Sequence, residues 1–134
     1  MTESESRVAL TSVSPFFIVR DLERALSFYR SSLGFDVVFR APDVDPFFGI
    51  VRRGGVQLLL KVVAEDVPAL PNSSRHPLAR WDAFVNVPDP DGLAAEFASR
   101  GVAFHTELAD TEDNLRGFEI QDADGYVLFF GRPR

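Results

Sequence analysis

Two segments of the chain repeat one pattern at nearly the same offset. Val19 and Val87 each end a short apolar run that precedes a helix-like segment, and they lie 68 residues apart. Further on, a glycine opens another apolar run in both halves, at Gly55 and Gly125, which lie 70 residues apart. Two similar offsets in the same order indicate an internal duplication, so the fold must contain two similar modules.

Each half of the repeat begins with a strand followed by a helix. Residues 15–19 are apolar and partly β-branched, as expected of a buried strand. Asp21 is a candidate N-cap, and apolar residues then recur at helical spacing up to Gly34, which fits a left-handed C-cap. Residues 81–101 repeat this arrangement, with Asp89 as the candidate N-cap and Gly101 as the expected helix stop.

Three strand-like runs follow each helix. They are residues 35–40, 47–52 and 56–63 in the first half, and residues 102–106, 117–121 and 126–130 in the second. A ferredoxin-like domain would have one strand after each helix, so this count excludes it. We therefore predict an α+β fold in which two β-α-β-β-β modules, a tandem duplication, form a curved, cup-shaped mixed sheet.

The segment between the modules has neither helical nor strand periodicity. Residues 64–80 are rich in proline and small polar residues, which is typical of a linker. The expected organisation is a flexible N-terminal tail over residues 1–12, a first module over residues 13–63, this linker, and a second module over residues 81–134.

Composition narrows the possible partners and chemistry. The chain has no cysteine, so it has no disulfide, thiolate metal ligand or cysteine nucleophile. Its net charge of −6 argues against nucleic-acid binding, which needs a basic face. The polar, acidic start lacks the features of a signal peptide, and no apolar run approaches membrane-spanning length, so we expect a cytoplasmic protein without a membrane partner.

The duplicated module resembles the vicinal oxygen chelate superfamily, which includes glyoxalase I, extradiol dioxygenases and bleomycin-resistance proteins. The resemblance covers residues 14–132. One mark is Val19-Arg20-Asp21-Leu22, followed by Phe28-Tyr29 and Leu33-Gly34-Phe35, similar to the first strand-helix signature of that group. The other is Asp122-Ala123-Asp124-Gly125-Tyr126, similar to the turn before its last strand.

The resemblance implies where a metal site would lie. In metal-using members a divalent ion is held by His and Glu from the first and last strands of each module. The matching positions here are Ser14, Asp82 and Phe129, and residues 58–60 of the fourth strand are all leucine. One carboxylate does not hold a catalytic ion, which takes about three protein ligands. We therefore predict no metal and no other cofactor.

Without a metal, the same face becomes a candidate pocket. Strand alternation predicts a mostly apolar surface with a few polar groups, as small-molecule sites have. Trp81 and the Phe47-Phe48 pair could form its rim or a subunit interface. The predicted ligand-binding residues are Ser14, Phe16, Leu58, Leu60, Trp81, Asp82, Phe84, Asn86 and Phe129.

Polar residues near this face have alternative explanations. Asp82 could pair with a ligand's ammonium, guanidinium or hydroxyl group, or with an internal partner such as backbone or the arginines Arg40, Arg52 and Arg116. Glu119 lies between Phe118 and Ile120, and we expect it to be solvated on the opposite face. His76 and His105 are expected to be surface or packing residues.

The leading hypothesis is a metal-independent binding protein of the glyoxalase/bleomycin-resistance type. The resemblance implies sequestration of a small hydrophobic or cationic, amphipathic molecule, and a homodimer whose paired modules complete the crevice. One alternative is an enzyme of the same superfamily, lyase-like or dioxygenase-like, that uses Asp82 or non-standard ligands. Another is a structural or interaction dimer whose cup is filled by side chains.

Overall fold

The computed structural model describes residues 7–134. The predicted tail over residues 1–12 lies in part outside these described residues, and its residues 7–12 are exposed. Within residues 7–134, neither helix is long and apolar enough to cross a membrane.

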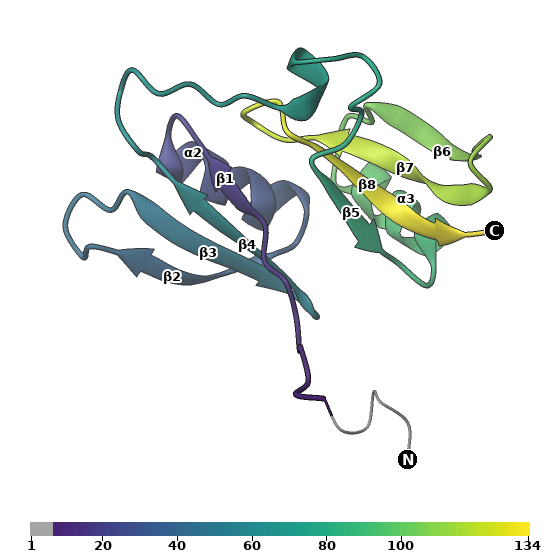
Figure 1. Cartoon of the computed structure of the whole chain (residues 1–134), viewed down its shortest axis with the longest axis horizontal. Helices are drawn as coiled ribbons and strands as arrows, with labels where there is room; N and C mark the ends of the chain where they lie inside the picture. Colours follow the sequence, from purple (N-terminus) through teal and green to yellow (C-terminus); the bar gives the residue numbers. More distant parts are fainter. Residues whose placement is uncertain (1–6) are drawn as a thin grey trace.

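Each half of the chain forms one β-α-β-β-β module, and the two modules stand next to each other with a helix behind each sheet (Figure 1). The first module contains β1 (Phe16–Ile18), α2 (Leu22–Ser27), β2 (Asp36–Ala41), β3 (Phe48–Arg53) and β4 (Val56–Lys61). The second contains β5 (Ala83–Asn86), α3 (Pro90–Ser99), β6 (Thr106–Asp110), β7 (Leu115–Gln121) and β8 (Val127–Pro133). The predicted α+β fold with duplicated modules is confirmed.

The two sheets have equivalent strand orders, β1-β4-β3-β2 and β5-β8-β7-β6. In both, the first strand pairs in parallel with the last, and the other pairs are antiparallel. The sheets remain two separate four-stranded sheets and do not close into one. Each therefore has two faces, only one of which its own helix can cover.

The predicted helix ends agree with the structure. Asp21 and Asp89 cap α2 and α3 by accepting hydrogen bonds from the backbone amides of Arg24 and Gly92. Gly34 and Gly101 have φ values of 72° and 78°, the left-handed conformation that glycine adopts without strain. A π-helical stretch over Phe28–Ser32 extends α2 before Gly34.

The sixth strand begins later in the sequence than predicted. We expected it over residues 102–106, but β6 spans Thr106–Asp110. Val102 and Phe104 do pack against the core, which explains their apolar pattern. The residues that pair with β7 lie at a sheet edge and are mostly exposed, so they carry no apolar alternation that would identify a strand.

The helix-facing side of each sheet forms the core. In β4, Leu58 and Leu60 are almost fully buried in this core, whereas Leu59 lies in register with Phe16 on the opposite face. The predicted placement of Leu58 and Leu60 on the open face is therefore wrong. Three consecutive leucines have no alternation, so the sequence could not distinguish the two faces of this strand.

A buried hydrogen bond joins the two modules. The Tyr29 hydroxyl, at the end of the first helix, donates to Asp122 Oδ2 in the β7–β8 turn over 2.6 Å. Asp122 Oδ1 accepts from the backbone amides of Asp124 and Tyr126, and the Tyr126 hydroxyl donates back to the Ile18 carbonyl over 2.6 Å. Burial raises the pKa of Asp122 to about 6, although these hydrogen bonds act in the opposite direction.

This shift predicts a pH dependence of stability. Because the folded state binds the Asp122 proton more tightly than the unfolded chain, the contribution of Asp122 to the free energy of unfolding should fall as pH rises from about 4 to 6. A shift of this size corresponds to at most about 3 kcal/mol. Asp122→Asn should remove this decline, as measured by urea unfolding at several pH values. The exposed Asp66→Asn control should retain it, and an Asp122→Asn profile identical to that of the unmodified protein would contradict the assignment.

Candidate ligand-binding site

One row of side chains crosses the open face of the second sheet. Register pairs Phe84 with Phe129, Phe129 with Glu119, and Glu119 with Thr106. The intervening residues, such as Phe118 and Phe130, face α3 and belong to the core. The row therefore places one carboxylate and one hydroxyl beside two aromatic rings.

Residues 71–82 cross this open face, and we refer to them as the strap. Asp82 fastens both ends of the strap to the sheet. Its Oδ1 accepts from the backbone amide of Asn72 over 2.8 Å, and its Oδ2 accepts from the backbone amide of Val127 in β8 over 2.8 Å. The Asn72 side chain also donates to the Trp81 carbonyl. The internal partners of Asp82 are thus backbone amides, and none of the three suggested arginines.

Trp81 covers the aromatic part of the row. Its ring lies 4.6 Å from that of Phe129 and 5.6 Å from that of Phe84, measured between centroids. Phe129 is 2% exposed as a result, although α3 packs on the other side of this sheet. The Arg80 guanidinium stacks 4.9 Å from the Trp81 ring and forms a 2.6 Å ion pair with Asp113.

Glu119 lies beneath Trp81 and is 8% exposed. Its Oε2 accepts from the indole Nε1 of Trp81 over 2.7 Å, and its Oε1 accepts from the Thr106 hydroxyl over 2.9 Å. The expectation of a solvated carboxylate on the opposite face is wrong. Alternation correctly separates Glu119 from Phe118 and Ile120, but those residues face the core and Phe129 faces the pocket.

These residues line a pocket with a volume of about 290 Å³. Its walls come from the strap (Ser73, Pro77, Arg80 and Trp81) and from the sheet and its edge (His105, Thr106, Glu107, Ala109, Thr111, Gly117, Glu119 and Phe129). The nearest basic nitrogen to Glu119 is His105 Nε2, 3.8 Å from Oε1 on a side chain that is 42% exposed. The other two contacts of the carboxylate come from neutral donors, and Arg80, which also lines the pocket, is paired with Asp113. Glu119 is therefore an anionic centre without an arginine or lysine partner.

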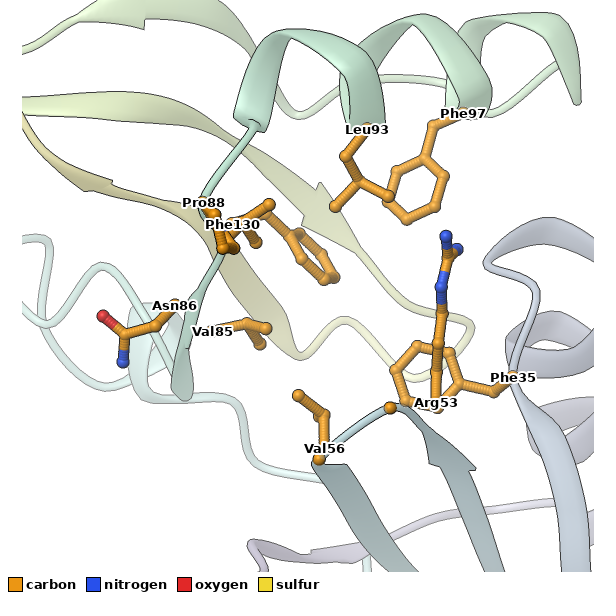
Figure 2. Close-up of a pocket in the computed structure, with 12 residues that line it drawn as sticks. Phe35, Arg53, Val56, Val85, Asn86, Pro88, Leu93, Phe97 and Phe130 are labelled. Atoms are coloured by element: carbon orange, nitrogen blue, oxygen red, sulfur yellow. The ribbon is translucent and has the colours of Figure 1, made fainter.

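The other predicted site residues lie at separate places. Phe16 and Asp82 line a second hollow of about 390 Å³ with residues of the linker. The Ser14 hydroxyl accepts a 3.3 Å hydrogen bond from Gln57 in a groove beside the N-terminal segment. Asn86 lines a pocket between the modules (Figure 2). Only Trp81 and Phe129 line the pocket around Glu119, with Phe84 packed against both.

The positions that correspond to metal ligands lack a suitable donor set. The Ser14 hydroxyl is paired with Gln57, both Asp82 oxygens accept backbone amides, and Phe129 has no donor atom. Across residues 7–134, no three His, Asp or Glu side chains come together as they would around a metal ion. These side chains do not fit a divalent ion at that position.

Residues 10–130 match the family model of the Glyoxalase/Bleomycin resistance protein/Dioxygenase superfamily. The chain belongs to this superfamily. No functionally curated protein matches it in sequence at a significant level. The resemblance expected from the strand-helix and turn motifs is therefore confirmed at the level of the superfamily.

Several solved structures have the same fold over nearly their whole length. A bleomycin-binding protein from Streptomyces verticillus, in complex with copper(II)-bleomycin, is 25% identical, with a TM-score of 0.69 and coverage of 96% of this chain and 100% of that one. TnmS3, an antibiotic-binding protein from Streptomyces sp. CB03234, is 24% identical with the same TM-score and coverage. TioX from Micromonospora sp. ML1 is 19% identical, with a TM-score of 0.69 and coverage of 92% and 99%.

Sequence reasoning within this superfamily missed the strap and Glu119. Trp81 was predicted to bind ligand and to be a candidate rim residue, but the linker has no periodicity, so nothing in it predicted that residues 71–80 would cover the second sheet. Glu119 had a usable signal, since antiparallel neighbours in register share a face and β7 adjoins β8. That signal required knowing which face the helix covers.

The contacts of Asp82 predict a structural role that can be separated from ligand binding. Asp82→Ala leaves the amides of Asn72 and Val127 without their acceptor, which should lower the free energy of unfolding by about 1–3 kcal/mol. Urea unfolding measures this change, with the exposed Asp66→Ala as control. Unchanged stability together with lost ligand binding would contradict the structural role and favour direct contact with a ligand.

Proposed function

We propose that this protein is a metal-independent small-molecule-binding protein that sequesters an amphipathic or cationic compound. The observation that carries this proposal is the Glu119 carboxylate, held by Trp81 and Thr106 inside an aromatic pocket. An aromatic wall offers apolar contact and cation–π attraction, while the carboxylate attracts a positive group. The proposed ligand therefore joins a flat apolar body to an ammonium or amidinium group.

The superfamily neighbours support binding as the activity. One solved neighbour is in complex with copper(II)-bleomycin, and another protein was solved in complex with bleomycin at 21% identity. Both share the two-module fold. The likeness to these two structures supports the proposal that the chain binds a small molecule. The Glu119 carboxylate supports the proposal that this molecule is a cation. Metal independence draws on the donor set at Ser14, Asp82 and Phe129.

Trp81 is the sole tryptophan of the chain and contacts Glu119, so its fluorescence reports on this pocket. Benzamidine, a small aromatic cation, should quench this fluorescence saturably, and benzamide, its neutral isostere, should bind more weakly. Glu119→Gln should weaken benzamidine binding about tenfold or more, because a charge-assisted hydrogen bond is lost.

Two controls sharpen this experiment. Glu112→Gln changes the same charge at an exposed position and should leave the benzamidine affinity unchanged. Dialysis against EDTA should also have no effect, and binding that disappears and returns with added Zn²⁺ or Ni²⁺ would contradict metal independence. Equal affinity for benzamide and benzamidine, no saturable quenching, or an unaffected Glu119→Gln variant would contradict cation recognition.

We also propose that two copies pair through their open sheet faces. No segment among residues 7–134 covers the first sheet as the strap covers the second, and a row of apolar side chains crosses its open face, from Phe16 through Leu59 and Ile50 to Phe39. Phe16 is 52% exposed and Phe39 is 48% exposed. An exposed apolar surface of this kind is typical of an interaction site.

Charge favours a second copy as the partner of this face. The first sheet's open face carries Arg52 and Lys61, whereas the pocket on the second sheet is lined by Glu119 and by the exposed Glu107. A two-fold pairing would place the first sheet of one protomer over the second sheet of its partner and repeat the same contact on the other side. Each pocket would then be closed by the partner's apolar sheet.

This pairing predicts a dimer that one charge can break. Sedimentation equilibrium should give the mass of a dimer for the unmodified protein. Phe39→Glu should shift it to a monomer, because pairing would bury an unpaired carboxylate. Val44→Glu introduces the same charge at an apolar loop residue that is 77% exposed and should remain dimeric. A monomeric unmodified protein, or a dimeric Phe39→Glu variant, would contradict this arrangement.

A further inference from the structure

A second pocket lies between the two modules and has no part in the site around Glu119. Its volume is about 270 Å³. Figure 2 shows apolar side chains converging on it from both halves of the chain, with Phe35 and Val56 from the first module and Leu93, Phe97 and Phe130 from the second. Phe97 and Phe130 belong to the helix-side core, so this pocket opens away from the face that the strap covers.

One charged side chain, Arg53, extends along the wall of this pocket between Phe35 and Phe97 (Figure 2). Its guanidinium carbon lies 5.9 Å from the centre of the Phe97 ring. Its two terminal nitrogens bond to Glu96 over 2.7 and 2.8 Å, and one also donates to the Leu33 carbonyl over 2.8 Å. Among the described residues, Arg53 Nε has no hydrogen-bond acceptor.

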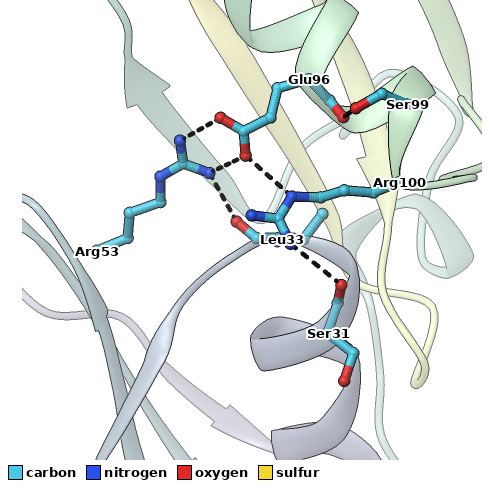
Figure 3. Close-up of polar contacts among 6 residues, drawn as sticks. All are labelled: Ser31, Leu33, Arg53, Glu96, Ser99 and Arg100. Carbon is cyan, nitrogen blue, oxygen red and sulfur yellow. Dashed lines mark hydrogen bonds and ion pairs between the residues drawn. The ribbon is translucent and has the colours of Figure 1, made fainter.

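Arg53, Glu96 and Arg100 form an ion-pair cluster between the two modules, which we call the joint, and its charges do not balance. Figure 3 shows that Glu96 is shared by two guanidinium groups, since Arg100 Nε also donates to Glu96 Oε2 over 3.0 Å. Arg100 also donates a 3.4 Å hydrogen bond to the Ser31 carbonyl, which is a neutral acceptor. Within residues 7–134, neither arginine has a second carboxylate partner, so the cluster carries one excess positive charge.

We propose that this pocket binds a compact aromatic monocarboxylate. The aromatic body would fill the apolar space between the modules, and the carboxylate would bind the Arg53 guanidinium edge beside Glu96. Burial of apolar area in the pocket would stabilise the bound aromatic ring. The excess positive charge of the cluster would select an anion even though the whole protein carries a net charge of −6. This site is independent of the proposed cation site, which has the opposite charge and lies on the opposite face of the second sheet.

Glu96 distinguishes this proposal from a merely structural joint. The ligand's carboxylate must share the arginines with Glu96, so the two anions compete. Glu96→Gln should therefore strengthen carboxylate binding about threefold or more while it weakens the joint itself. A site of purely structural importance would lose binding or stay unchanged on the same substitution.

Benzoate is the probe, and two-dimensional NMR of the labelled full chain is the measurement. Benzoate should produce saturable shifts at Val56, Val85 and Leu93, whereas benzamide and benzamidine should produce much weaker shifts there. Arg53→Gln should weaken benzoate binding about tenfold or more, since the charge-assisted contact is removed. Its matched control is Arg24→Gln, an exposed arginine of α2 that lines neither pocket.

Leu93→Phe tests the same pocket without touching the ion pairs. This residue is partly buried on the pocket wall, so a larger ring should fill the space and block benzoate even if Arg53→Gln proves unstable. Glu119→Gln should leave benzoate binding unchanged, which separates this site from the proposed function. Absence of saturable benzoate shifts at the three residues, equal binding of benzamide, or unchanged affinity in Arg53→Gln and Leu93→Phe would overturn the proposal.

Discussion

A four-stranded sheet has two faces, and in each module a single helix covers one of them. Almost every other feature of the molecule follows from the second face, because exposed apolar area is costly in water. The second sheet covers its face with the strap, which buries Phe129 under Trp81. The first sheet keeps Phe16 and Phe39 exposed. The two duplicated modules therefore share a scaffold but differ in the sheet face that their helix does not cover.

The boundary between the two modules has polar contacts at two places and apolar contacts between them. Tyr29 and Asp122 form a buried pair at one place, and Arg53, Glu96 and Arg100 form a half-exposed ion-pair cluster at the other. Burial and the adjacent Asp122 carboxylate raise the pKa of Tyr29 well above its ordinary value, so it remains a hydrogen-bond donor. Protonation of Asp122, or a ligand bound at the arginine cluster, would change the free energy with which the two modules associate.

Local sequence signals predicted the scaffold well because they are physical requirements of single elements. Asp21, Asp89, Gly34 and Gly101 stand where the helix ends require a cap or a left-handed residue, and all four were confirmed. The errors concern contacts between elements. The three leucines of β4 have no alternation, and Glu119 could be placed only by knowing which side the helix covers. The strap is held by hydrogen bonds from the backbone amides of Asn72 and Val127 to the Asp82 carboxylate. Contacts to backbone amides leave no pattern in the sequence that could predict them.

The strap is a single continuous segment, fastened to the sheet largely through Asp82, yet it supplies one wall of the pocket around Glu119. Residues between its fastened ends contribute little to the core, since most of them are exposed. Substitutions between the fastened ends of the strap should therefore leave the fold of the two modules intact. An exchange of residues 73–80 would reshape one wall of the pocket while the repeated scaffold, including Glu119 and Phe129, stayed in place.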